Sequence, residues 1–281
     1  MSEITRGNKR LHAGVATALA TGLIGATLAG CHSDSDKSEA TSSASSSVAS
    51  TASSQNPANA PDPAKVLQES ARTTATLQSL HLDLVTENLG NFPLASVSAS
   101  VTNQPQGAGS AVGHAKFRRD KDADFEEGDF LVTDKTFYTK NDDGTWKKVG
   151  DSEKIYDPGV LLDKDRGLAH VLESISDPKS GDAETIDGIK TVQIKGEIPA
   201  DVIDTIVPTL GLGGGSLPVT VWIADVGTGT QPGAGDPSPS EQPSSGKGPN
   251  VVRIKIEKDK GSVTTTFSKW AEPVEIPNPK G

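Results

Sequence analysis

The chain has little of what small exported domains commonly use to hold a fold together. Among 281 residues there is one cysteine, Cys31, and one methionine, and aromatic residues make up only 4%. A single cysteine excludes an intrachain disulfide, so packing and backbone hydrogen bonds must stabilise the fold. The thiol of Cys31 is therefore available for another role.

An excess of basic residues is also absent. The net charge is −10, and the residues that follow position 30 hold 24 Lys and Arg against 36 Asp and Glu. An acidic body of this kind has no electrostatic attraction for nucleic acid, and it offers no basic patch for anionic head groups. We therefore expect no nucleic-acid partner.

Motifs that carry catalysis or bind metals are missing as well. His81, His114 and His170 have no second His or Cys at a ligand spacing, and no G-x-S-x-G sequence is present. The glycine run 211–215 lacks the Lys-Ser/Thr of a phosphate-binding loop and precedes a strand pattern. The acidic pair in 163–165 is best explained as a solvated helix end. We expect no enzyme, no metal and no cofactor.

What the sequence does have begins with an export signal. Three basic residues lie within the first ten positions, and an apolar run follows over 13–28, about 16 residues, which is short for a membrane-spanning helix. The run ends in Leu28-Ala29-Gly30-Cys31, the pattern of a bacterial lipobox. The alternative is a plain secretory signal with an accidental cysteine. The lipobox predicts that Cys31 becomes an acylated N-terminus anchored outside the cytoplasm.

The composition divides the sequence into three parts. Residues 1–30 are the lipoprotein signal peptide, and residues 31–61 form a Ser/Ala-rich tether with almost no large apolar side chain. Residues 62–281 form a single domain. Within it, the Gly/Pro/Ser-rich segment 227–249 is predicted to be a flexible loop inserted into a hairpin, because strand patterns lie on both sides of it.

The domain is predicted to be α+β. Roughly eleven short segments alternate apolar and polar residues, which is typical of half-buried antiparallel strands. Helical patterns occupy 62–79, 157–175 and 199–208, and they do not alternate with strands as in a βαβ fold. We therefore expect one large curved antiparallel sheet with helices gathered on one side.

One face of this sheet is built from unusually small residues. By parity, Val97, Ala99 and Val101 share a face with residues 111, 113, 115 and 117 of the next strand, where Phe117 is the only bulky member. Such a face leaves volume that must be filled. Either the first helix packs very closely against it, or it lines a cavity for an apolar ligand.

Several stretches resemble the mycobacterial LppX/LprA/LprF/LprG lipoprotein family. The resemblance covers nearly all of 62–281 and is most specific in the Tyr-Asp-Pro to Asp-Arg-Gly stretch. The residues that carry it are Leu28–Cys31, 101–107, 130–133, 154–159, 162–168, 217–223 and 268–270. It implies a LolA-like half-barrel whose sheet and helices enclose a hydrophobic cavity.

The resemblance also implies a function. The cavity would take acylated lipids and glycolipids, such as phosphatidylinositol mannosides, and the protein would carry them across the periplasm toward the outer membrane while anchored on the outer face of the cell membrane. The alternative is a ligand-sensing or adaptor lipoprotein that presents itself to a membrane protein. The candidate ligand-binding residues are Val97, Ala99, Val101, Gly113, Ala115, Phe117, Val171 and Ile203, and Cys31 is the lipid anchor.

Overall fold

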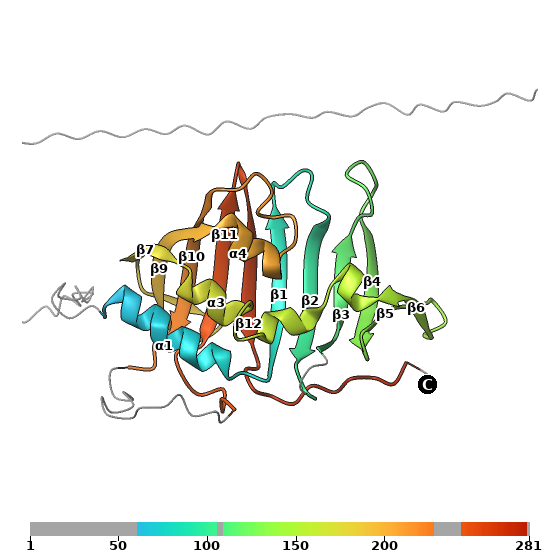
Figure 1. Cartoon of the computed structure of the whole chain (residues 1–281), viewed down its shortest axis with the longest axis horizontal. Coiled ribbons are helices and arrows are strands. Elements are labelled where there is room, and N and C mark those ends of the chain that lie inside the picture. Colours follow the sequence, from blue (N-terminus) through green and yellow to red (C-terminus); the bar gives the residue numbers. More distant parts are fainter. Residues whose placement is uncertain (1–60, 106–108, 228–242, 280–281) are drawn as a thin grey trace, which may run out of the picture. The chain divides into compact units, whose positions relative to one another are not determined.

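The domain is organised around one open sheet (Figure 1). The computed structural model describes residues 61–105, 109–227 and 243–279. Every strand pair in this part of the chain is antiparallel. The twelve strands in sheet order are β6 (Trp146–Asp151), β5 (Thr136–Lys140), β4 (Glu126–Thr133), β3 (Ser110–Phe117), β2 (Leu94–Thr102), β1 (Ser79–Glu87), β12 (Gly261–Ser268), β11 (Val251–Lys258), β10 (Ser216–Ala224), β9 (Ile189–Pro199) and β7 (Ser176–Ser180), with β8 (Glu184–Ile186) also paired to β9.

Among the described residues, five short helical elements lie on one face of this sheet, which we call the inner face, the other being the outer face (Figure 1). They are α1 (Pro63–Ala75), α2 (Ser152–Ile155), the 3-10 helix η2 (Pro158–Leu162), α3 (Leu168–Glu173) and α4 (Ala200–Ile206). The predicted α+β class with an antiparallel sheet and helices on one side is confirmed.

Local sequence explains where the helices begin. The Asp62 carboxylate accepts a hydrogen bond from the Ala64 N–H at 3.0 Å, and Pro63 occupies the first position of α1. The pair Asp157-Pro158 repeats this arrangement at η2, where Asp157 accepts from the Gly159 N–H at 2.9 Å. Both starts agree with the sequence prediction.

The ends of the helices and one strand differ from the prediction. Helix α1 ends at Ala75 rather than near Ser79, and α3 ends at Glu173, although Ile175 beyond it is buried as its spacing suggested. The unpredicted strand is β7, whose sequence SDPKS shows no apolar alternation. It lies at a sheet edge, where a proline such as Pro178 is tolerated.

The segment predicted as a flexible loop joins β10 to β11, as expected from the strands on either side. Residues 228–242 lie outside the described part of the chain. Residues 243–249, in contrast, contact the folded domain: the Ser244 N–H donates to the Thr76 carbonyl at 2.9 Å, and the Asn250 side chain donates to the Gly246 carbonyl at 2.7 Å. This part of the loop belongs to the domain.

A single large buried cluster joins helices and sheet. Leucines of α1 and η2 and side chains of α3 and α4 pack with Leu80, Leu82 and Leu84 of β1 and with the apolar residues of β9 to β12. Helix α1 contacts α3, β7 and β10, whereas η2 contacts β2 and β3. The first helix therefore packs over the β7–β10 side, and a different element covers part of the small-residue face.

Candidate functional site

The small residues predicted to share a face lie side by side. In the register of β2 and β3, Val97 is opposite Ala115, Ala99 is opposite Gly113, and Val101 is opposite Ala111. Leu84, Leu82 and Leu80 of β1 continue these three rows on one side. Directly opposed residues of an antiparallel pair point to the same face, so the rows form one apolar floor on the inner side of the sheet.

Gly113 is required by the backbone as well as by the floor. A Cβ atom at this position would overlap the Ser98 carbonyl oxygen and lie 2.8 Å from the Cα and Cβ of Ala99. The backbones of β2 and β3 therefore approach each other closely at Gly113, where no side chain rises from the floor. Because a side chain at position 113 is excluded, the space above the Ala99–Gly113 row stays free.

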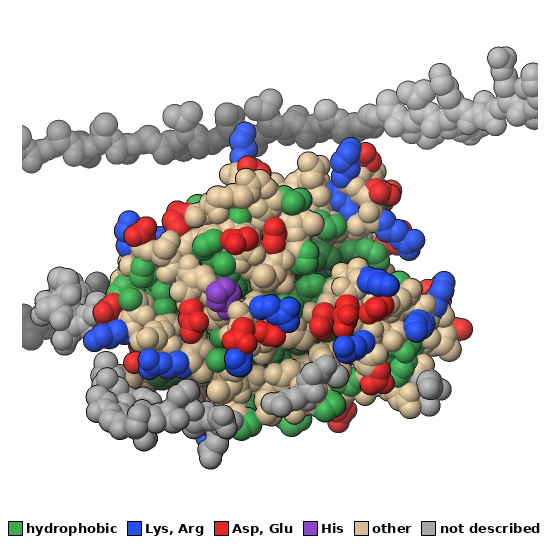
Figure 2. All heavy atoms as spheres, viewed as in Figure 1, with side chains coloured by type: hydrophobic (Ala, Val, Ile, Leu, Met, Phe, Trp, Pro, Cys, Tyr) green, Lys and Arg blue, Asp and Glu red, His purple; other side chains and the backbone are tan. Residues whose placement is uncertain are grey.

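The upper part of the floor is open to solvent. Figure 2 shows hydrophobic side chains in a hollow at the upper right of the molecule, over the strands between α4 and the α2–η2 segment seen in Figure 1. Five apolar residues of this region are only half-buried, and we call the hollow that they line the open groove: Leu94, Val97, Ala115, Phe117 and Phe130. An open apolar surface of this kind is a candidate ligand site.

Aromatic rings form the side of the open groove toward β5. Phe130 lies opposite Gly113 on β4, and its ring stacks on that of Phe137 with the centroids 5.8 Å apart and the planes 11° from parallel. The sequence analysis placed these strands correctly but did not select the two phenylalanines. Their register opposite small residues is the signal that would have found them.

The lower part of the floor is closed by η2. Ala99, Val101 and Ala111 are buried, and they belong to the same cluster as Leu161 and Leu162 of η2. The approach of η2 depends on two glycines, because a Cβ on Gly109 would overlap the backbone of Gly159. The structure thus divides the predicted lining residues of β2 and β3 into a buried set and a half-buried set.

A tyrosine hydrogen bond connects the two segments that border the open groove. The hydroxyl of Tyr156, between α2 and η2, donates to the Ile206 carbonyl at the end of α4 at 2.9 Å. Burial, followed by the nearby charge of Asp157, raises the pKa of Tyr156 well above its usual value. The hydroxyl therefore remains a proton donor, and α4 stays joined to the α2–η2 segment.

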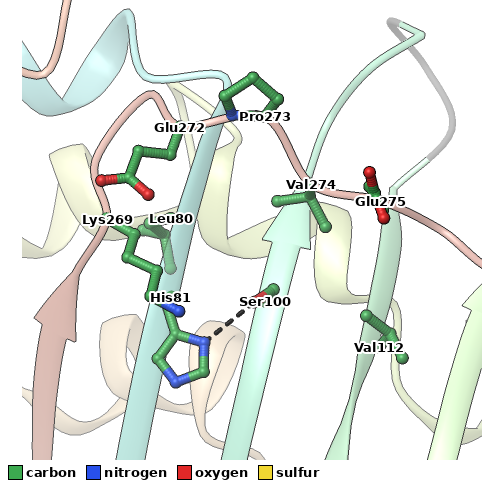
Figure 3. A pocket seen from close by; sticks show the side chains of 9 residues that line it. All are labelled: Leu80, His81, Ser100, Val112, Lys269, Glu272, Pro273, Val274 and Glu275. Carbon is green, nitrogen blue, oxygen red and sulfur yellow. Dashed lines mark hydrogen bonds between the residues drawn. The ribbon is translucent and has the colours of Figure 1, made fainter.

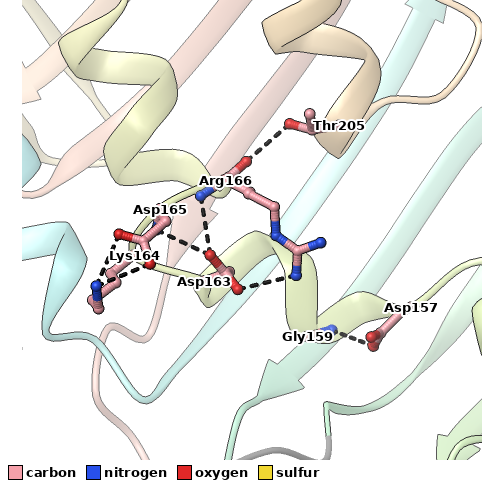
Figure 4. Close-up of polar contacts among 7 residues, drawn as sticks. All are labelled: Asp157, Gly159, Asp163, Lys164, Asp165, Arg166 and Thr205. Atoms are coloured by element: carbon pink, nitrogen blue, oxygen red, sulfur yellow. Dashed lines mark hydrogen bonds and ion pairs between the residues drawn. The ribbon is translucent and has the colours of Figure 1, made fainter.

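The acidic pair near η2 has a structural role. Asp163 Oδ1 accepts the backbone N–H groups of Asp165 and Arg166 at 2.9 and 3.0 Å, and its Oδ2 accepts from the Arg166 guanidinium at 3.1 Å (Figure 4). Partial burial acts to raise the pKa of Asp163, but these hydrogen bonds and the Arg166 charge hold it below its ordinary value. The Arg166 carbonyl in turn accepts from Thr205 of α4 at 2.9 Å. The turn therefore connects to α4, a role that the explanation as a solvated helix end did not include.

The two helical residues predicted to contact ligand lie elsewhere. Val171 of α3 and Ile203 of α4 are fully buried within the core cluster. They pack the helices onto the sheet and do not face the open groove. Ligand contact at these positions stays a prediction, and it would require the packed side of the domain to open.

Two pockets occur at another place, where the C-terminal segment crosses the lower ends of β1 to β3. One of about 180 Å³ is lined by His81 and Ser100 of the outer face and by Lys269, Glu272 and Glu275 (Figure 3). His81 Nδ1 and Ser100 Oγ are 2.9 Å apart there. The second, of about 510 Å³, is lined by Gln78, Ser79, Thr102, Gln104, Ser244, Ala271, Pro273, Val274 and Ile276. The lining of the first pocket is mainly polar, and that of the second is mixed.

Within residues 61–105, 109–227 and 243–279, no group of His, Cys, Asp or Glu side chains is arranged to hold a metal ion. No helix in the same ranges is long and apolar enough to cross a membrane. Cys31, the predicted signal peptide 1–30 and the predicted tether 31–61, apart from its last residue, lie outside the described residues.

Fold and site together define a class: an open antiparallel sheet with helices on one face and an exposed apolar groove. Comparison with known proteins identifies the family, because residues 62–276 match the model of the LppX_LprAFG lipoprotein family. The chain belongs to this family.

Its relatives are named as carriers and not as enzymes. LprF of Mycobacterium tuberculosis, named as a candidate transporter of diacylated glycolipids, is 46% identical over 231 residues, or 82% of this chain and 83% of that protein. LprG of Mycolicibacterium hassiacum, a lipoarabinomannan carrier protein, is 33% identical over 221 residues, or 78% of this chain and 85% of that protein. These names agree with the prediction that the chain is not an enzyme.

Solved structures support the fold. The crystal structure of LprF from Mycobacterium bovis matches with a TM-score of 0.70 at 44% identity, covering 79% of this chain and 99% of that one. Lipoprotein LppX of Mycobacterium tuberculosis matches with a TM-score of 0.53 at 24% identity, covering 77% and 100%. Both confirm the open antiparallel sheet that the sequence predicted.

Proposed function

We propose that this lipoprotein binds acylated lipids or glycolipids in the open groove and carries them across the periplasm of the cell envelope. The observation that carries the proposal is the half-buried apolar floor formed by Val97, Ala115 and Phe117 beside the low row at Ala99 and Gly113. An acyl chain is the ligand class that this surface suits, because it is long, narrow and apolar.

Hydrophobic burial supplies the driving force. Removing apolar surface from water contributes roughly 25 cal/mol per Å². Small side chains in the centre of the floor leave room for an acyl chain, and the larger side chains of Leu94 and Phe130 form the walls of the groove. Soluble monomers rarely leave a contiguous apolar surface exposed unless something covers it part of the time.

The relatives suggest the ligand class. A candidate diacylated glycolipid transporter and a lipoarabinomannan carrier are 46% and 33% identical to this chain. We therefore propose acylated glycolipids, such as phosphatidylinositol mannosides, as ligands. The lower floor beneath η2 would extend the groove into the enclosed cavity that the family resemblance implies, with Val101 as a further lining residue.

Location follows from the N-terminal sequence. We propose that residues 1–30 are removed, that Cys31 carries the lipid anchor, and that residues 31–61 tether the domain 62–281 to the outer face of the cell membrane. An anchor with two or more acyl chains gives stable attachment where one chain is marginal. A tethered carrier can take lipid from one membrane and offer it to another within its reach.

Two measurements test the function. The full chain is purified from its own host, and an organic extract is examined by mass spectrometry, with the protein-free eluate of a mock purification as control. Transfer of a fluorescent diacyl lipid from donor to acceptor vesicles is then followed. We expect stoichiometric acylated lipid in the extract and protein-dependent transfer. Absence of both contradicts the proposal, whereas tightly retained lipid without exchange favours the sensing or adaptor alternative.

A further inference from the structure

Two exposed large hydrophobic residues lie in connecting segments at the end of the sheet where the groove is open; Val85, also exposed at this end, lies within β1 and points to the outer face. Leu212 is 66% exposed in the segment between α4 and β10, and Phe125 is 40% exposed immediately before β4. The first residues of β4 and β10 and the last residues of β3 and β11 all lie at the same end of the antiparallel sheet as Val97 and Ala115. Leu212 and Phe125 thus flank the open end of the groove.

The segment that carries Leu212 is fixed by a lysine. The Lys258 ammonium, at the end of β11, donates hydrogen bonds to the carbonyls of Leu210 at 2.5 Å and Leu212 at 2.6 Å. Leu210 is buried at this point, whereas Leu212 projects outward. The Leu212 side chain is therefore held in its exposed position, because hydrogen bonds fix the backbone on both sides of Gly211.

On the Phe125 side of the groove, an arginine side chain fixes the backbone in a similar way. Arg118 donates to the Phe92 carbonyl from Nε at 3.2 Å and to the Lys121 carbonyl from Nη1 at 2.8 Å, and it also bonds the Gly90 carbonyl. Its guanidinium lies 4.9 Å from the centre of the Phe125 ring. One cation thus ties the β1–β2 and β3–β4 turns together and supports the exposed ring.

We propose that Leu212 and Phe125 are the points at which this domain docks on a lipid bilayer, with the open end of the groove facing the membrane. This inference rests on the proposed lipid-carrier function. Two fixed apolar side chains on either side of a lipid-binding groove would enter the interfacial layer and let an acyl chain pass between membrane and groove without crossing bulk water.

The occupant is a bilayer because Leu212 and Phe125 are separate tips on different connecting segments and form no continuous surface for a protein partner. A stable protein interface requires about 1,000 Å² or more of complementary surface, whereas shallow insertion needs only apolar tips. The charged residues beside Phe125 are ion-paired, Arg119 with Glu126 and Lys121 with Asp122, so the apolar tip and not a basic patch would make the contact. The chain that precedes the domain also favours a bilayer. Its predicted anchor at Cys31 and the roughly 30 residues that follow span up to about 100 Å when extended. Tethering makes a weak contact effective by raising the local concentration.

Fluorescence quenching in the full, lipid-anchored chain tests the docking directly. Leu212→Trp and Phe125→Trp are each reconstituted in phosphatidylcholine vesicles with brominated acyl chains, and the signal of the wild-type protein, with its three tryptophans, is subtracted. Val226→Trp is the matched control, because Val226 is 45% exposed and follows β10 at the opposite end of the sheet. We expect the added tryptophans at 212 and 125 to lose several-fold more fluorescence than the one at 226.

Transfer kinetics provide the second readout. The variant with Leu212→Asp and Phe125→Asp is expected to transfer lipid several-fold more slowly than wild type while retaining its bound lipid, and Val226→Asp is expected to match wild type. Equal quenching at all three positions overturns the proposal, as does an unchanged transfer rate in the double variant. If the wild-type protein transfers no lipid, the carrier function fails, and quenching alone then decides whether the domain docks.

Discussion

At the scale of single residues, the proposed function depends on positions with small side chains or none. Ala99, Gly113 and Ala115 keep the centre of the floor low, and parity alone was enough to place them on one face. Parity works here because side chains of a strand alternate strictly. It could not show which of them remain exposed, because that depends on η2, an element some 50 residues away in the sequence.

Tyr156 illustrates a residue whose role could not be predicted from the sequence. Its partner is the backbone carbonyl of Ile206, 50 positions away. Because every residue has a backbone carbonyl, the sequence does not indicate which one accepts the hydrogen bond. The motif around Tyr156 was recognised as specific, but the reason is visible only in the fold. It holds two borders of the open groove together.

Tyr156→Phe is expected to lower the free energy of unfolding by about 1 kcal/mol, because the hydrogen bond to Ile206 is lost and its carbonyl remains partly buried. Denaturant unfolding measures the change. Tyr138→Phe, at the other tyrosine of the chain and on the outer face, serves as control and is expected to have a smaller effect. Equal stability of Tyr156→Phe and wild type would contradict the connecting role.

At the scale of elements, helix starts and apolar strands were predictable, and weakly patterned elements were not. Asp62-Pro63 and Asp157-Pro158 mark helix starts through a local hydrogen bond and a fixed φ angle. Strand β7 has neither an apolar face nor a turn signal, and it forms because β9 offers an unpaired edge. Tertiary context alone determines such an element.

The β10–β11 connection gives a test at this scale. Deleting 228–242 is expected to change the free energy of unfolding by less than about 1 kcal/mol, since loop-closure entropy depends weakly on length. Extending the deletion through 248 removes Ser244 and Gly246, which bond to Thr76 and Asn250, and is expected to lower the melting temperature clearly. Identical melting of the two deletions would show that residues 243–248 contribute nothing to the fold.

At the scale of the whole molecule, the proposed lipid anchor at Cys31 precedes a domain with an open apolar groove. The sequence predicted the class of fold, the anchor and the small-residue face from local patterns. It could not predict how the floor divides into a lower part beneath η2 and an upper part exposed to solvent, because that division arises from the packing of helices over the sheet. The same packing places Val171 and Ile203 in the core.

Membrane attachment is tested by Cys31→Ala. Without the thiol, no thioether to diacylglycerol can form, so the protein is expected either to leave the membrane fraction or to keep its signal segment uncleaved. Fractionation of cells, combined with N-terminal sequencing, measures both. A mutant that is cleaved and still fully membrane-bound would show that another part of the chain supplies the anchor.

The central claim is that the open groove holds the acyl chains, and Ala115 lies at its centre between Val97 and Gly128. The most direct measurement is the amount of lipid recovered per mole of protein, with thermal unfolding recorded on the same samples, for Ala115→Trp and for His114→Trp. His114 is the neighbouring residue and is exposed on the outer face. The account predicts that both variants fold and that only Ala115→Trp loses its lipid. Wild-type lipid content in a folded Ala115→Trp variant would contradict it.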